Sequence, residues 1–120
     1  LLVGHQNDPW LFFRGMDAAV LPSYKDEGIP QSLLQAMFAE CPALGATTGG
    51  IPEIVIDNET GLLFPPKTIP ELATALRSTL RDQDKTSARV QKALALVRSR
   101  HTLDQIGTAV LSIVESVRRK

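Results

Sequence analysis

Short apolar runs alternate with segments of helical periodicity along the first half of the chain. The apolar runs are residues 1–3, 18–21, 42–46 and 62–64. Each has the length of a buried strand. Between the second and third runs, Leu33, Leu34 and Met37 recur at helical spacing, so residues 30–40 are predicted to form a helix with one apolar face. Such alternation implies right-handed βαβ crossovers and a parallel sheet flanked by helices, which is the α/β class.

Prolines and small polar residues predict where further helices begin. Asn7 or Asp8 is placed to cap a helix whose first residue is Pro9, because proline has no N–H group to leave unpaired at that position. Pro52 is predicted to begin a short helix with Glu53 in its first turn, where a capping role is favoured over substrate contact.

The second half of the chain has helical periodicity alone. From Ile69 onward the pattern divides into three amphipathic helices, separated at 82–84 and at 101–102. The last segment, 103–117, carries its apolar residues on one face.

Composition narrows the range of partners. The chain has 13 Lys and Arg against 13 Asp and Glu, so no basic surface for nucleic acid is indicated. No apolar run approaches the roughly 20 residues of a membrane span. Cys41 is the single cysteine, which excludes an internal disulfide and a multi-cysteine metal site; it is interpreted as a structural thiol.

Three loops follow predicted strands, and the carboxyl ends of parallel strands meet at one edge of a sheet. Residues 4–8, 22–30 and 47–51 are therefore expected to line one crevice there. Neither the dinucleotide motif Gly-x-Gly-x-x-Gly nor a P-loop lysine motif is present.

The start of the 30–40 helix is predicted to bind an anion, typically a phosphate. Pro30 suits the first helical position, and the free N–H groups around it point at the mouth of the loop. These groups belong to Ile29, Gln31, Ser32 and Leu33. A helix N-terminus favours negative charge through its dipole and its unpaired donors.

An ordered set of short motifs resembles a known family. The motifs are Leu21-Pro22-Ser23, Glu27-Gly28-Ile29-Pro30, Gln35-Ala36-Met37, Gly49-Gly50-Ile51-Pro52-Glu53 and Asn58-Glu59-Thr60-Gly61-Leu62-Leu63. Together and in this order they resemble the C-terminal domain of a retaining GT-B glycosyltransferase of the group 1 type. The resemblance implies a Rossmann-like donor-binding half of a GT-B fold, incomplete at its N-terminus.

The resemblance also implies roles for individual residues. Glu27, the first family glutamate, would be the catalytic-site residue that binds hydroxyls of the donor sugar. The second family glutamate, which binds the ribose, is replaced here by Gln35. An amide oxygen still accepts a hydrogen bond, but a charge-assisted bond is lost. The sugar and diphosphate would lie against Gly28, Ile29, Gln31, Ser32 and Leu33, and the nucleotide against Gly4, His5, Gln6 and Gln35.

The expected organisation is a partial nucleotide-sugar-binding domain over residues 1–102 and a C-terminal helix over 103–120. In the resembled family such a helix packs back on an N-terminal domain, which here would precede Leu1. The chain alone is therefore expected to be inactive. The apolar side chains of Trp10, Phe12 or Phe13 are expected to be uncovered or to pack on a second copy as a homodimer.

The expected function is transfer of a sugar from a nucleotide-diphosphate sugar to a saccharide, lipid-linked or small-molecule acceptor, with retention and without metal or cofactor. A cytoplasmic location is expected, with peripheral membrane contact of the full-length protein left open. Two alternatives remain. One is a nucleotide-sugar-binding or assembly module that has lost catalysis, mildly favoured by Gln35, and the other is an interaction domain, favoured only if the three loops form no pocket.

Overall fold

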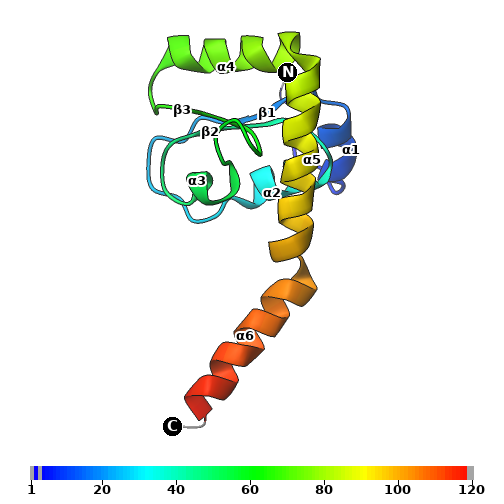
Figure 1. The fold of residues 1–120 in the computed structure, drawn as a ribbon, viewed down its shortest axis with the longest axis vertical. Coiled ribbons are helices and arrows are strands. Elements are labelled where there is room, and N and C mark those ends of the chain that lie inside the picture. Colours follow the sequence, from blue (N-terminus) through cyan, green and yellow to red (C-terminus); the bar gives the residue numbers. More distant parts are fainter. Residues whose placement is uncertain (1, 3, 119–120) are drawn as a thin grey trace.

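A three-stranded parallel sheet forms the centre of the molecule. The computed structural model describes residue 2 and residues 4–118. In these residues the strands β1 (Ala19–Leu21), β2 (Ala43–Ala46) and β3 (Leu62–Phe64) pair in the order β1-β2-β3. The predicted α/β class with a parallel sheet is confirmed (Figure 1).

Six helices accompany the sheet in the described residues. They are α1 (Pro9–Arg14), α2 (Gln31–Phe38), α3 (Ile51–Ile54), α4 (Ile69–Arg81), α5 (Gln83–Arg100) and α6 (Leu103–Arg118). Asp8 caps α1 as predicted, since its Oδ1 accepts from the N–H of Trp10 at 3.1 Å. Pro30 does not begin α2: it is the N-cap, because its ψ of 120° is extended rather than helical.

The helices cover both faces of the sheet. On one face α2, α3 and α5 bury a core whose members include Met37, Ile51, Val55 and Val97. On the other face α4 packs on β2 and β3 around Leu44, with Phe64 and Ala75 in the same cluster. Figure 1 shows α4 on one side of the sheet and α2 and α3 on the other, with α5 running past both layers. Alternate positions of each strand thus pack on opposite helical layers.

The ends of the chain differ from the rest of the fold. The strand expected at residues 1–3 falls largely outside the described residues, and Leu2 is in no strand and fully exposed. α6 extends away from the sheet and has no buried residue (Figure 1). Its apolar stripe includes Ile106, Val110 and Val114, each about half exposed. The helix is where the sequence predicts it, and its packing on a preceding domain stays a prediction.

Apolar surface is also uncovered on α1, as predicted. No residue of α1 is buried, and the side chains of Trp10 and Phe12 are 38% and 36% exposed. Phe13 alone among these aromatics packs against the core. The homodimer expected from this surface stays a prediction.

Cys41 lies in the core where α2 leads into β2. Its side chain is 2% exposed, and burial raises the pKa of the thiol from 9.0 to about 11. The thiolate is the reactive form of cysteine, so this environment suits the structural role predicted for it.

We predict that native Cys41 reacts slowly with a disulfide reagent at pH 8 and faster as pH rises toward 11. The raised pKa keeps the thiol neutral in the folded chain, whereas unfolding restores an ordinary pKa. Absorbance-monitored thiol titration with and without denaturant measures both rates. Equal rates for folded and unfolded chain at pH 8 would contradict the prediction.

The turn before β3 depends on one buried hydroxyl. Thr60 is 5% exposed; its Oγ1 donates to the carbonyl of Ile54 at 2.6 Å and accepts from the N–H of Ile56 at 2.8 Å. Next to it Gly61 lies against β2, where an added Cβ would meet the carbonyl oxygen of Ala43 at 2.3 Å. The threonine–glycine pair therefore has a structural reason independent of any ligand.

Thr60→Val should lower the free energy of unfolding by about 1–3 kcal/mol for each backbone group left unpaired. Valine keeps the shape of threonine but cannot bond Ile54 or Ile56. The matched control is Thr108→Val on exposed α6, whose hydroxyl only donates to the carbonyl of Asp104. Urea unfolding of both variants checks the prediction, which fails if the two midpoints shift equally.

Candidate functional site

Two loops at the carboxyl edge of the sheet contact each other directly. Residues 22–30 follow β1 and residues 47–50 follow β2. The N–H of Gly50 donates to the carbonyl of Glu27 at 2.7 Å, and Thr48 Oγ1 donates to the carbonyl of Lys25 at 3.0 Å. Both loops therefore lie at the same edge of the sheet, as predicted, while their lining of one shared crevice stays a prediction.

Glycine is required where the loops touch. Gly49 has a φ of +52°, and a Cβ there would lie 2.2 Å from the carbonyl oxygen of Glu27. A Cβ on Gly50 would lie 2.8 Å from the carbonyl carbon of Gly28. No side chain fits at either position, so the Gly-Gly pair allows two backbones to pack without intervening atoms.

Glu27 is exposed at this edge and is held by a neighbour. Ser23 Oγ donates to Glu27 Oε1 at 2.6 Å. No other atom of the described residues bonds the carboxylate, so Oε2 is open to a ligand. The loop forms a shallow hollow of about 290 Å³, lined by Pro22, Ser23, Tyr24, Lys25 and Glu27.

The start of α2 provides unpaired donors beside this loop. The first helical bond runs from the N–H of Leu34 to the carbonyl of Pro30, and Pro30 offers no side-chain cap. The preceding N–H groups belong to Gln31, Ser32 and Leu33, and no described residue accepts from them. The Leu33 side chain is in the core, so only its backbone can face a ligand. Gly28 and Ile29, also predicted to bind, are exposed in the loop before the helix.

Gln35 lies in a different hollow from Glu27. This hollow of about 470 Å³ is mostly apolar, between α1, α2 and the junction of α5 and α6. It is lined by Trp10, Gln31, Leu34, Gln35, Phe38, Val97, His101, Thr102 and Leu103. The Trp10 and Phe38 rings meet edge to face, with their centroids 5.2 Å apart. Gln31, at the start of α2, lies beside this hollow as well.

Residues 4–6 line neither hollow in the described structure. Gly4 has a left-handed φ of +69° with open space around it, and His5 is exposed. Gln6 is half-buried and has a contact within the chain. The predicted nucleotide-binding role of Gly4, His5 and Gln6, and the convergence of their loop with the other two, stay predictions.

A pair of lysines near Tyr24 was not predicted. Lys67 Nζ lies 5.3 Å from the centre of the Tyr24 ring, and Lys25 Nζ lies 6.0 Å from it. Lys67 follows β3 and has a φ of +62°. Its approach to a residue far away in the sequence follows from the parallel sheet, which brings the ends of β1 and β3 to one edge.

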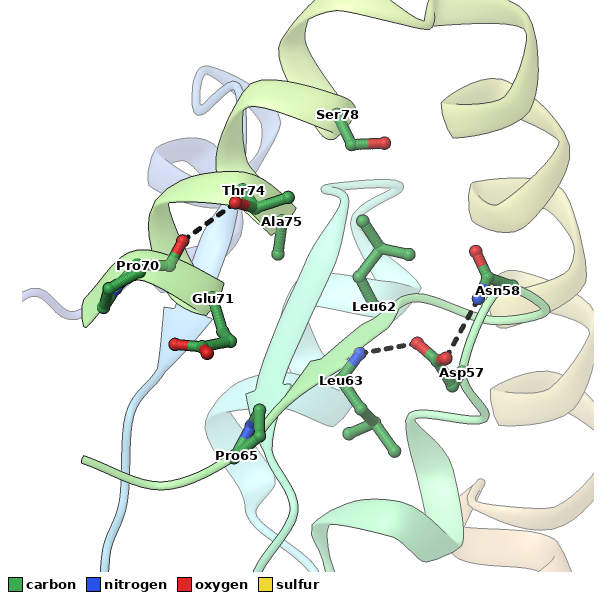
Figure 2. A pocket seen from close by; sticks show the side chains of 10 residues that line it. All are labelled: Asp57, Asn58, Leu62, Leu63, Pro65, Pro70, Glu71, Thr74, Ala75 and Ser78. Carbon is green, nitrogen blue, oxygen red and sulfur yellow. Dashed lines mark hydrogen bonds between the residues drawn. The ribbon is translucent and has the colours of Figure 1, made fainter. Parts of the chain in front are cut away.

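A third hollow, of about 410 Å³, runs along the outer edge of β3 beside α4 (Figure 2). No predicted site residue lines it. Asp57 Oδ1 accepts from the N–H of Leu63 at 2.9 Å and so occupies a strand-edge donor that would otherwise be open to another chain. We interpret this hollow as a consequence of two structural features: the Asp57 side chain that blocks the open edge of β3, and the packing of α4 beside that strand.

Metal-binding groups are not gathered anywhere in residues 2 and 4–118: no three His, Cys, Asp or Glu side chains are placed to hold an ion. That the reaction needs no metal stays a prediction. Glu53 lies in the first turn of α3 as predicted, but its carboxylate accepts no bond in the described residues.

Comparison with known proteins decides the family. The family described as "Glycosyl transferases group 1" matches residues 1–95. The chain belongs to this family. It is 33% identical over 104 residues to a glycogen synthase of Mycobacterium tuberculosis, a match that covers 86% of this chain and 25% of that protein.

Solved structures have the same fold over most of this chain. A Rickettsia africae glycosyltransferase matches with a TM-score of 0.94 at 16% identity, over 100% of this chain and 32% of that one. Anabaena Alr3699/HepE, solved with UDP-glucose, matches with a TM-score of 0.83 at 24% identity, over 88% of this chain and 29% of that one. The fold is consistent with the C-terminal domain of a GT-B glycosyltransferase, and the chain spans about a quarter to a third of these proteins. None of the described helices is both long and apolar enough to cross a bilayer.

We predict that Gly49→Ala lowers the free energy of unfolding by about 1–3 kcal/mol, because Ala both strains the positive φ and clashes with Glu27. Gly28→Ala is the control, since a Cβ on Gly28 meets nothing within 4 Å. Denaturant unfolding should leave this control within about 0.5 kcal/mol of wild type. Equal destabilisation of the two variants would refute the close approach of the loops.

Proposed function

We propose that the chain is the donor-binding domain of a retaining glycosyltransferase, which transfers a sugar from a nucleotide-diphosphate sugar to an acceptor. The observation that carries the proposal is the pairing of two features at one sheet edge. Glu27 presents a free carboxylate oxygen, and four positions later α2 begins with unpaired N–H groups. The first suits sugar hydroxyls and the second suits a phosphate.

Charge develops on the leaving diphosphate as the bond between the sugar carbon and the phosphate oxygen breaks. The fixed N–H groups at the start of α2 stabilise that charge without reorganising. They therefore stabilise the transition state more than the bound nucleotide sugar. Pro30 has no N–H, so the donors are its neighbours Gln31, Ser32 and Leu33. The acceptor oxygen forms the new bond on the same face that the diphosphate leaves, and its proton departs with the diphosphate.

The two family glutamate positions take separate parts of the donor in this proposal. Glu27 binds sugar hydroxyls, while Gln35 binds the ribose through its amide. The position of Glu27 and Gln35 in two separate hollows supports this division. The base would then lie toward Gly4, His5 and Gln6.

A second domain would supply the acceptor site. The chain spans 25% of the glycogen synthase and 29% of Alr3699/HepE, so catalysis by this chain alone is not expected. The apolar stripe of α6 suits packing against such a domain, with residues 1–102 binding the donor. Alr3699/HepE was solved with UDP-glucose, which makes this donor a reasonable first probe.

A non-catalytic nucleotide-sugar-binding module is the second candidate. It is favoured by the glutamine at position 35, where the family has a carboxylate. The two candidates differ in turnover but not in binding. Calorimetric titration of the chain with UDP-glucose tests binding, and a protein that joins this chain to an acceptor domain tests transfer. Absence of binding for UDP- and GDP-sugars alike would refute both.

In an enzyme containing this chain, Glu27→Ala should lower kcat about ten- to a hundredfold, the equivalent of losing a charged hydrogen bond worth about 1.5–3 kcal/mol. Gln35→Ala should instead raise KM for the donor, at a cost of about 0.5–1.5 kcal/mol, because the ribose is remote from the reacting carbon. Gln35→Glu should increase the affinity for the nucleotide-sugar donor. Steady-state kinetics decide: an equal loss of kcat in Glu27→Ala and Gln35→Ala would contradict the assignment.

A further inference from the structure

We propose that Ser23 is a positioning residue for Glu27, acting together with the loop at 47–50. The proposal rests on the proposed role of Glu27 at the donor sugar. It adds that the carboxylate is oriented before the donor arrives, by one side-chain bond and two bonds to the backbone around it.

The side-chain bond fixes one carboxylate oxygen. Ser23 Oγ donates to Glu27 Oε1 at 2.6 Å, which is the short distance of a hydrogen bond to an ionised acceptor. Ser23 is half-buried and follows Pro22 directly after β1, so the hydroxyl that donates this hydrogen bond is attached to the end of the sheet. Glu27 is exposed, and without this bond its side chain would sample several rotamers.

The backbone on either side of Glu27 is fixed from the second loop. Gly50 N–H donates to the carbonyl of Glu27, and Thr48 Oγ1 donates to the carbonyl of Lys25. Gly49 packs against the backbone of Glu27 so closely that no side chain would fit between them. The backbone and the side chain of Glu27 are therefore held by different segments, which leaves Oε2 as the free acceptor.

Orienting the carboxylate in advance reduces the entropy lost when a sugar hydroxyl binds. Removing the Ser23 hydroxyl should therefore lower the affinity for ligands that carry the sugar and leave the affinity for ligands without the sugar unchanged. This difference separates positioning from general damage to the loop, which would weaken both kinds of ligand.

The experiment is calorimetric titration of the 120-residue chain with UDP-glucose and with UDP. Ser23→Ala should lower the affinity for UDP-glucose about three- to tenfold and leave the affinity for UDP unchanged. Ser23→Thr, which keeps the hydroxyl, should restore the affinity. Ser87→Ala removes an exposed hydroxyl on α5 and is the matched control. In the Glu27→Ala background, Ser23→Ala should have no further effect.

The outcomes distinguish this inference from the proposed function. The positioning role is refuted, while the proposed function stands, if Glu27→Ala lowers the affinity for UDP-glucose and Ser23→Ala does not. The same conclusion follows if Ser23→Ala lowers the affinity for UDP as much as the affinity for UDP-glucose. If Glu27→Ala changes neither ligand, the proposed function fails at this residue. A ligand-free measurement applies in every case: three-bond couplings of the Glu27 β-protons should indicate one rotamer in wild type and averaging in Ser23→Ala. Averaged couplings in wild type overturn the proposal.

Discussion

The close contact between the backbones of two loops is the constraint on which the candidate site depends. Gly50 bonds the carbonyl of Glu27, and Gly49 occupies space that no other residue could share with it. Because β1 and β2 are parallel neighbours, their carboxyl ends bring these loops to the same edge of the sheet. The position of Glu27 relative to α2 thus follows from sheet pairing, and packing on both faces of the sheet stabilises that pairing.

Most secondary structure could be predicted because the apolar runs and the helix-capping residues in the sequence matched the residues that the fold buries and the positions where its helices begin. The apolar runs formed the strands β1, β2 and β3, of which β2 is buried throughout, and Asp8 with Pro9 began α1 as expected. Pro30 was placed one residue wrong, since proline tolerates both the first helical position and the extended N-cap. In α4 the apolar spacing from Leu76 continues at Leu80, yet Leu80 is half exposed, and Ala75 and Thr79 are the buried residues of this helix. α4 buries only a narrow stripe against the face of the sheet, so a leucine slightly out of phase with that stripe lies exposed.

The candidate site was less predictable than the fold. Motif order pointed to Glu27 and to the start of α2, but not to the bond from Ser23, because a rotamer of an exposed side chain leaves no periodic signal. Lys67 reaches Tyr24 only through the sheet topology. Likewise, spacing alone could not show that Gln35 faces a hollow lined by Trp10 and Phe38 rather than the hollow beside Glu27. These contacts depend on tertiary structure, which single-chain spacing does not encode.

In the proposed function a nucleotide sugar binds at the carboxyl edge of the sheet, with its phosphates at the start of α2. Backbone amide chemical shifts recorded during titration with UDP-glucose test this most directly. We expect the largest changes for Gly28, Ile29, Gln31, Ser32 and Leu33, with residues 70–78 beside the third hollow unchanged. Changes confined to residues 57–78, or no saturable change at the start of α2, would contradict it.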